Sequence, residues 1–194
     1  LARGAAAGEW IGCRNDRFPV VSRVFGMPGW QTRAVLTGGV AIPESVTYEQ
    51  ALSVFGITGL TAYVGLQDIG KPKPGETVVV SGAAGGVGAV AGQIAKIMGA
   101  RVIGIAGSPE KCRWVGEELG FDDCIDYRAE DVGAGLSRTC PNGIDVYFDN
   151  VGGATLNQVL ARINDHARIA LCGAISQYDS GAPASGPANL INAV

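Results

Sequence analysis

The stretch from Thr77 to Lys96 reads TVVVSGAAGGVGAVAGQIAK and decides the fold that we expect. A run of valines, typical of a strand, leads into a glycine-rich turn, and a helix-compatible run follows. The spacing Ala83-x-Gly85-x-x-Gly88 is closely related to the G-x-G-x-x-G fingerprint of dinucleotide-binding folds. Because the motif lies between a predicted strand and a predicted helix, it has the context that this fingerprint requires.

The residue types of this turn suit a bound diphosphate. Gly85 has no Cβ to block a phosphate, and Gly88, with Gly92 one turn later, lets the helix lie close to the sheet. The start of the helix offers unpaired amides and the positive end of its dipole. We therefore expect a dinucleotide here; the alternative is a glycine-rich packing turn without a ligand.

Beyond residue 76, predicted strands alternate with predicted helices. The strands are expected at Thr77–Ser81, Arg101–Ala106, Asp123–Asp126, Asp145–Asp149 and Arg168–Cys172. The helices are expected at Gly86–Met98, Pro109–Leu119, Ala129–Arg138 and Ala154–Ile163. The strand runs are rich in Val, Ile and Ala, as is typical of strands that helices cover on both faces. This alternation predicts an α/β fold with a doubly wound parallel Rossmann sheet.

The beginning of the chain has a different pattern. Short β-like runs interrupted by glycine and proline predict the end of a small all-β region, at Val20–Val21, Val24–Phe25 and Arg33–Leu36. Thr47 and Gln50 have the spacing of a capping box, which predicts a helix from there through Phe55. A second helical stretch is expected at Leu60–Leu66. We place the boundary between two domains at residues 45 and 46, giving domains 1–45 and 46–194.

Composition excludes several classes of protein. The 194 residues carry 15 Lys and Arg against 18 Asp and Glu, a net charge of −3, and 47% are hydrophobic. This balance argues against disorder, against a basic nucleic-acid-binding surface and against a polybasic membrane anchor. The five cysteines form no C-x-x-C pair, and their odd number prevents complete pairing, so we expect reduced thiols and a cytoplasmic protein. The single histidine, His166, is expected in a solvated loop, and no metal site is expected.

The residues after the second strand favour NADP over NAD. An NAD site places an Asp or Glu near position 106, whereas this chain has Ala106-Gly107-Ser108. Ser108 is a candidate N-cap, which puts Lys111 in the first turn of the next helix. A cation there opposes the helix dipole, and an anion nearby would explain it. We assign Ser108 and Lys111 to the 2′-phosphate of NADP; the alternative is a solvated surface lysine.

A doubly wound sheet binds its ligand where the strand order reverses, at the carboxyl ends of the first and fourth strands. Asn150-Val-Gly-Gly153 follows the fourth strand, and Gly173-Ala-Ile-Ser-Gln-Tyr178 follows the fifth, so both segments are candidates for the nicotinamide half. Position alone leaves open an ordinary turn for the first segment and a packing role for Tyr178. Asp149 could orient Asn150 or cap the next helix.

Several segments together resemble one family. They are Gly56–Tyr63, Lys73–Val80, Gly82–Gly92, Gly107–Cys112, Phe148-Asp-Asn-Val-Gly-Gly153 and Leu171-Cys-Gly-Ala-Ile-Ser-Gln-Tyr178. In this order they resemble the zinc-independent medium-chain dehydrogenase/reductases, in the branch of the leukotriene B4 12-hydroxydehydrogenase/prostaglandin reductases and 2-alkenal reductases. The resemblance covers nearly the whole chain. It implies that residues 1–45 are the tail end of a GroES-like all-β domain and that 46–194 lack the last Rossmann strand and the return of the chain.

The resemblance also assigns roles to residues. It implies a phosphate-contacting turn at Gly85, Gly86, Val87 and Gly88, a 2′-phosphate contact at Lys111, and an adenosine contact at Tyr127. It implies a coenzyme contact at Asn150 and a loop framing the nicotinamide at Cys172, Gly173, Ala174, Ile175, Ser176, Gln177 and Tyr178, with Tyr178 also reaching the substrate.

The implied activity is NADPH-dependent reduction of the carbon–carbon double bond of α,β-unsaturated ketones or aldehydes, with Tyr178 or water as the proton donor. A quinone reductase of the same superfamily and a non-catalytic NADP-binding protein are the alternatives. The expected partner is a small enone or alkenal, and a homodimer is possible within this family.

Overall fold

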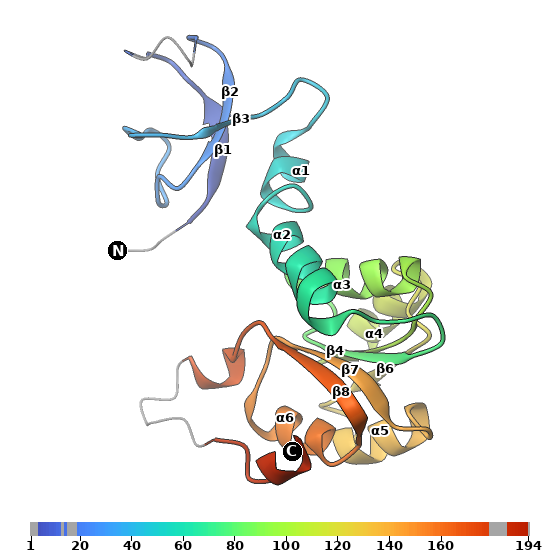
Figure 1. The fold of residues 1–194 in the computed structure, drawn as a ribbon. Helices are drawn as coiled ribbons and strands as arrows, with labels where there is room; N and C mark the ends of the chain where they lie inside the picture. The colour runs from blue at the N-terminus through green and yellow to red at the C-terminus, as the bar shows by residue number, and fades with distance from the viewer. Residues whose placement is uncertain (1–3, 13, 15–18, 179–185, 194) are drawn as a thin grey trace. The chain divides into compact units, whose positions relative to one another are not determined.

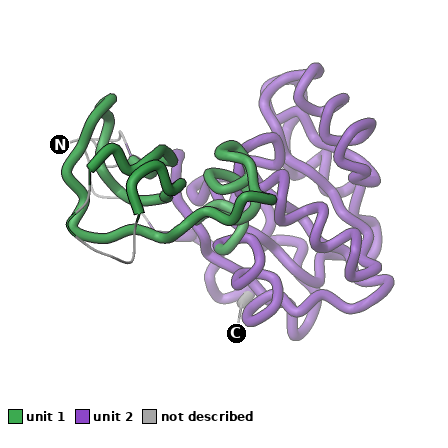
Figure 2. Tube along the Cα trace, turned by 90° about the horizontal axis from the view of Figure 1, so that it is seen from above, with its two compact units in different colours: residues 1–60 green, residues 61–194 purple. Residues whose placement is uncertain are grey.

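The computed structural model describes residues 4–12, 14, 19–178 and 186–193 (Figure 1). The chain divides into two compact units, residues 1–60 and 61–194 (Figure 2). The predicted boundary between residues 45 and 46 falls inside the first unit, and the assignment of residues 1–45 to a GroES-like domain stays a prediction.

The first unit contains a small antiparallel sheet of the order β1-β2-β3. Its strands are β1 (Ala6–Glu9), β2 (Arg23–Gly26) and β3 (Val40–Ala41). Of the three predicted runs, only Val24–Phe25 lies in a strand. The predictions for Val20–Val21 and Arg33–Leu36 are wrong: the first pair forms a turn, in which Val21 has a φ of 65°, and the second run is irregular.

The capping box at Thr47 is confirmed. The Thr47 hydroxyl accepts from the Gln50 amide at 3.2 Å, and the Gln50 side chain accepts from the Thr47 amide at 2.9 Å. The helix α1 (Tyr48–Leu52) is shorter than predicted, because the backbone of its C-cap Ser53 leaves the helical conformation, with a φ of −112° and a ψ of −99°. Helix α2 (Ile57–Val64) begins earlier than the predicted stretch and continues directly into the π-helical η1 (Gly65–Gly70).

The second unit is built on a parallel sheet of five strands in the order β6-β5-β4-β7-β8 (Figure 1). The strands are β4 (Thr77–Ser81), β5 (Arg101–Ala106), β6 (Asp123–Asp126), β7 (Ile144–Asp149) and β8 (Ile163–Leu171). Since the chain starts at the central strand, moves to one edge and then returns to the other, the order reverses between β4 and β7. The predicted doubly wound Rossmann sheet is confirmed.

Four helices connect these strands: α3 (Gly86–Ile97), α4 (Pro109–Glu117), α5 (Val132–Thr139) and α6 (Gly153–Leu160). The 3₁₀ turns η2 (Ile175–Gln177) and η3 (Leu190–Ala193) follow β8. Helix α5 starts later than predicted because Asp131 caps it, accepting from the Ala134 amide at 2.9 Å.

The end of α6 is the least accurate part of the prediction. Strand β8 begins at Ile163, where a helix was expected, because Ile163 pairs with Ile144 of β7. The register shifts after this pair, and His166, with a φ of 63°, lies within the irregular part of β8. The predicted loop position of His166 is therefore wrong, although its side chain is exposed as expected.

Alternation along β4 divides the hydrophobic core between the two faces of the sheet. Val78 and Val80 pack on the face covered by α3 and α4, whereas Val79 packs on the face covered by α5 and α6. All three side chains are fully buried, and each contributes about 1.5–3 kcal/mol through the apolar surface that it removes from water. Gly92 is needed on α3, because a Cβ there would lie 1.8 Å from the Phe121 ring.

Two further expectations concern cysteines and membranes. The structure joins Cys112 of α4 to Cys124 of β6 in a disulfide, so the expectation of reduced thiols is wrong for this pair. Their Cα atoms are 5.3 Å apart, within the range that a disulfide spans. Among the described residues, no helix combines the length and the apolar character needed to cross a bilayer.

Candidate dinucleotide-binding site

The turn after β4 has a conformation that only its glycines allow. Gly82 has a φ of +60°, and the Ala83 amide that follows donates to the Ile105 carbonyl of β5 at 3.0 Å. A Cβ on Gly88 would lie 2.3 Å from the Gly82 carbonyl oxygen. The last glycine of the motif therefore allows α3 to start directly against the turn, as the sequence predicts.

Helix α3 begins without a side-chain cap. Its N-cap is Gly85, which has no side chain to accept a hydrogen bond from the first turn. In the part of the chain that the structure describes, the amides of Gly86, Val87 and Gly88 donate to no protein group. These amides, together with the positive end of the helix dipole, form an anion-binding cradle.

A cavity of about 590 Å³ lies beside this cradle, where the strand order reverses. We call it the switch-point cavity. Its walls come from the ends of β4, β5 and β7, the starts of α4 and α6, the segment after β6 and the turn η2. The lining residues are Gly82, Ala84, Gly85, Ile105, Ala106, Lys111, Tyr127, Val151, Gly152, Ala154, Thr155, Ile175 and Ser176.

This lining includes five of the residues predicted for the site: Gly85, Lys111, Tyr127, Ile175 and Ser176. None of the described residues that line the cavity is acidic. Lys111 forms no ion pair with any residue that the structure describes. The described walls of the cavity therefore offer a positive charge and uncapped helix amides and carry no carboxylate, a combination that suits a phosphorylated ligand.

Ser108 positions Lys111 through the start of α4. The Ser108 hydroxyl accepts from the Lys111 amide at 3.3 Å, and Pro109 occupies the first helical position. The backbone amide of Glu110 and the Ser108 hydroxyl lower the pKa of the Glu110 carboxyl below its usual value, so it stays ionised. Ser108 itself does not line the switch-point cavity.

Tyr127 depends on a glycine that the sequence analysis did not assign to the site. A Cβ on Gly107 would lie 2.7 Å from the Tyr127 hydroxyl, so the absence of a side chain at 107 lets the ring lie against the end of β5. The guanidinium of Arg128 lies 5.9 Å from the centroid of the Tyr127 ring. The ring forms one wall of the switch-point cavity.

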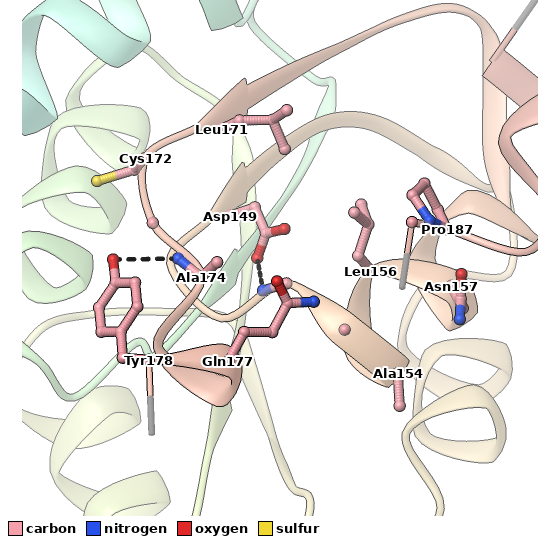
Figure 3. Close-up of a pocket in the computed structure, with 14 residues that line it drawn as sticks. Asp149, Ala154, Leu156, Asn157, Leu171, Cys172, Ala174, Gln177, Tyr178 and Pro187 are labelled. Carbon is pink, nitrogen blue, oxygen red and sulfur yellow. Dashed lines mark hydrogen bonds between the residues drawn. The ribbon is translucent and has the colours of Figure 1, made fainter. Parts of the chain in front are cut away.

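The remaining predicted loop residues line a second cavity of about 640 Å³, which we call the Tyr178 cavity (Figure 3). Cys172, Gly173, Ala174, Gln177 and Tyr178 contribute to it. The Tyr178 hydroxyl accepts from the Ala174 amide at 3.2 Å, which leaves the hydroxyl hydrogen free to be donated elsewhere. Burial and the nearby negative charge of Asp149 raise the pKa of the Cys172 thiol, so the thiol stays protonated at neutral pH.

Asn150 lines neither cavity. Its side-chain amide donates to the Ser81 carbonyl at 2.7 Å, and its backbone amide donates to the Ser81 hydroxyl at 2.9 Å. Asn150 thus ties the end of β7 to the end of β4, and its contact with a coenzyme stays a prediction. The structure also places Gly86, Val87 and Gly88 outside the cavity lining, at the adjoining start of α3.

Sequence reasoning missed several lining residues that have no distinctive side chain. They are Gly82, Ala84, Ile105, Ala106, Ala154 and Thr155, whereas Val151 and Gly152 belong to the segment 150–153 that the sequence had already singled out. Each follows or ends a strand, or starts a helix, at the carboxyl edge of the sheet, and this position was the available signal. Among the described residues, no three His, Cys, Asp or Glu side chains are placed to hold a metal ion.

Curated proteins with similar sequences include reductases that use NADPH. The chain is 45% identical over 172 residues to the NADPH-dependent curcumin reductase of Escherichia coli (strain K12). The matched residues make up 86% of this chain and 49% of that protein. It is 42% identical over 193 residues to prostaglandin reductase 1 of Mus musculus, covering 95% of this chain and 58% of that protein. The chain spans about half the length of the curated relatives it matches.

Solved structures agree with these relatives. CurA of Vibrio vulnificus in complex with NADPH matches with a TM-score of 0.90 and 43% identity, over 98% of this chain and 58% of that one. The quinone oxidoreductase of Escherichia coli complexed with NADPH is more distant, with a TM-score of 0.77 and 26% identity over 100% of this chain and 60% of that one.

The parallel sheet, the glycine turn and the switch-point cavity define a Rossmann-type fold of the dinucleotide-binding class. The chain belongs to the zinc-binding dehydrogenase family, whose profile matches residues 86–191. Within it, the chain is a member of the zinc-independent medium-chain dehydrogenase/reductases, together with the curcumin, prostaglandin and 2-alkenal reductases. The resemblance stated from the sequence is confirmed.

Proposed function

We propose that this chain holds NADPH in the switch-point cavity and serves an enzyme that reduces the carbon–carbon double bond of α,β-unsaturated ketones or aldehydes. The observation that carries the proposal is Lys111. It lines a cavity that adjoins the uncapped amides of α3 and that, among the described residues, has no acidic side chain in its walls. The names of the curcumin, prostaglandin and 2-alkenal reductases among the relatives support the reaction class.

Each half of the coenzyme has suitable residues. The diphosphate would lie against the amides of Gly86, Val87 and Gly88, and the 2′-phosphate would accept hydrogen bonds from Lys111 and Ser108. Tyr127 would contact the adenosine. The loop Cys172–Tyr178 would frame the nicotinamide. The groups proposed for the phosphates are backbone amides, a hydroxyl and an ammonium group, and every one of them can donate a hydrogen bond.

When bound, NADPH would supply the hydride for the β-carbon of the substrate. The chain's own part is to place and protonate the rest of the substrate. The Tyr178 hydroxyl, whose oxygen is held by the Ala174 amide, is free to donate its hydrogen to the substrate carbonyl or to the α-carbon. Water is the alternative proton source.

The first test is a titration of the chain with NADPH and with NADH, followed by the fluorescence of the reduced nicotinamide. We expect saturable binding of NADPH that is at least tenfold tighter than binding of NADH, since a charge-assisted contact to the 2′-phosphate is worth about 1.5–3 kcal/mol. Equal affinity for both coenzymes would refute the assignment of Lys111.

The second test separates the reaction classes in the intact enzyme that contains this chain. Faster oxidation of NADPH with an enone than with a quinone supports the proposed function. Faster turnover with the quinone would favour a quinone reductase, and tight NADPH binding without turnover of any acceptor would favour a non-catalytic binding protein. We also propose a cytoplasmic homodimer, which fractionation and light scattering would test.

A further inference from the structure

A buried polar cluster joins the carboxyl ends of β4 and β7. It consists of Ser81, Tyr147 and Asp149, which we call the Asp149 cluster, and all three residues are fully buried. One carboxylate oxygen of Asp149, Oδ1, accepts four hydrogen bonds. They come from the Ser81 hydroxyl (2.9 Å), the Tyr147 hydroxyl (2.8 Å), the Val151 amide (2.9 Å) and the Gly152 amide (2.9 Å); Figure 3 shows the contact of Asp149 with Gly152.

The other oxygen of the same carboxylate has no partner. Asp149 Oδ2 is buried and forms no hydrogen bond with any described residue. A buried carboxylate is expensive to desolvate, and it is usually satisfied on both oxygens. Because all four donors contact Oδ1 and none contacts Oδ2, the hydrogen bonds do not stabilise the two carboxylate oxygens of Asp149 equally. These bonds fix the geometry of the groups that donate.

Those groups include the backbone of the turn after β7. Asp149 holds the amides of Val151 and Gly152 directly. It also holds Asn150 through Ser81, whose hydroxyl donates to Asp149 and accepts from the Asn150 amide at 2.9 Å. Thus one carboxylate, directly or through one hydroxyl, determines the position of three consecutive residues of this turn.

This turn faces the switch-point cavity. Val151 and Gly152 line it, and Gly152 is the N-cap of α6, with a φ of 68°. Asp149, by contrast, contributes no surface to the switch-point cavity. It can therefore affect a ligand in the switch-point cavity only through the turn, although Asp149 also lines the neighbouring Tyr178 cavity.

We propose that Asp149 is a positioning residue, which together with Ser81 and Tyr147 sets the Asn150–Gly152 turn in the geometry that binds the coenzyme. This inference rests on the proposed function. Of the two roles left open from the sequence, it assigns the first, since the carboxylate orients Asn150 through Ser81. The second is wrong, because α6 begins at Gly152 without a side-chain cap.

Tyr147 remains a donor throughout the useful pH range. Burial and the charge of Asp149 raise the pKa of its hydroxyl well above the ordinary value of 10.0. The Tyr147 hydroxyl therefore keeps its hydrogen and continues to donate it to Asp149.

The test compares variants of the cluster with a control of the same kind. Tyr147→Phe and Ser81→Ala each remove one donor to Asp149. Thr139→Val is the control, because Thr139 is also buried and its hydroxyl also donates one hydrogen bond, to the Gly135 carbonyl at 2.9 Å within α5, away from either cavity. For each variant, the NADPH dissociation constant and the free energy of unfolding are measured.

We expect all three variants to lose stability, but only the cluster variants to lose affinity. Tyr147→Phe should raise the NADPH dissociation constant about three- to tenfold, as the loss of one net hydrogen bond would. Ser81→Ala should raise it more, because it also removes the acceptor of the Asn150 amide. Thr139→Val should leave it within about twofold, since a distant site adds no coupling to the cavity.

Asp149 itself provides a rescue experiment. Asp149→Ala should abolish measurable binding, whereas Asp149→Asn should restore most of it. The side-chain oxygen of asparagine can replace Oδ1. Its NH2 group takes the place of Oδ2, which forms no hydrogen bond with any described residue. If Asp149→Ala does not fold, Tyr147→Phe and Ser81→Ala still decide the question.

The outcomes separate the two proposals. If the unaltered chain binds no NADPH, the proposed function fails, and this inference with it. If the unaltered chain binds NADPH and the cluster variants match Thr139→Val in affinity, the function stands and the positioning role is wrong.

Discussion

Helices α3 and α4 start at the same edge of the same sheet, after the neighbouring strands β4 and β5, yet their first turns are built differently. The start of α4 is closed. Ser108 caps it, Pro109 has no amide to offer, and Glu110 adds a carboxylate to the first turn. The start of α3 is open, because Gly85 provides no cap.

The difference shows which part of each helix is available to a ligand. A Ser or Asp at an N-cap stabilises a helix by about 1 kcal/mol over alanine, and α5, capped by Asp131, uses it as α4 does. Helices α3 and α6 both begin at an uncapped glycine, and both of these glycines line the switch-point cavity. The cavity thus receives backbone amides from the uncapped helices and a side chain, Lys111, from the capped one.

The largest effect is expected from closing the space at the start of α3. In Gly88→Ala, the new Cβ would clash with the Gly82 carbonyl at 2.3 Å, so the turn must shift. We expect NADPH binding to be lost and the free energy of unfolding to fall by about 1–3 kcal/mol, measured by titration and by urea denaturation. Gly116→Ala on α4 is the control: no atom lies within 4 Å of its Cβ, so stability should rise by about 0.5–1 kcal/mol.

The next effect concerns the side chain that α4 contributes. Lys111→Ala should weaken NADPH binding by about 1.5–3 kcal/mol, which is roughly ten- to 150-fold, and leave NADH binding nearly unchanged. Lys111→Arg keeps the charge and should retain most of the affinity. Calorimetric titration with both coenzymes checks this, and parallel losses for the two would contradict a contact with the 2′-phosphate.

A smaller effect is expected from opening the start of α4. Ser108→Ala removes the cap, so the free energy of unfolding should fall by about 1 kcal/mol, and NADPH affinity should fall less than in Lys111→Ala. Ser108→Asp should keep the stability, since Asp also caps helices, but weaken NADPH binding through its negative charge. An affinity unaffected by Asp would place the 2′-phosphate elsewhere.

The smallest effect on stability is expected from adding a cap to α3. Residue 85 has extended backbone angles that serine adopts, and a Cβ there would lie 3.1 Å from the Gly82 carbonyl, a tight but tolerable contact. Gly85→Ser should therefore change the free energy of unfolding by less than about 0.5 kcal/mol. Its hydroxyl would compete with phosphate for the same amides and its Cβ would obstruct the approach of the phosphate, so NADPH affinity should fall at least tenfold. Unchanged affinity would show that these amides do not bind the ligand.

Local sequence determined the parts of the fold that were predicted well. Glycine spacing fixes the β4–α3 turn, because only glycine tolerates the φ of Gly82 and the closeness of Gly88 to it. Capping residues fix the starts of α1 and α4, because the Thr47 and Ser108 hydroxyls accept hydrogen bonds from backbone amides of the first turn. The prediction failed where pairing between distant strands determines the structure. Ile163 belongs to β8 because it pairs with Ile144 of β7, and the local sequence around Ile163 does not distinguish a strand from the end of a helix.

The candidate site divides in the same way. Lys111 and Tyr127 could be assigned from residue type and position, and the structure brings them together in one cavity. Two contacts could not be predicted. The Tyr127 ring lies where a side chain at Gly107 would lie, and the Asn150 side-chain amide donates to the Ser81 carbonyl. Both depend on the distance between segments that only folding brings together.

The four hydrogen bonds on one oxygen of Asp149 also bear on the entropy of binding. Fixing the backbone of a free residue costs about 1–2 kcal/mol. The turn after β7 has already lost that freedom when the chain folds, so an arriving ligand meets a rigid surface. The affinity of the cavity is to this extent determined during folding, before any encounter with the coenzyme.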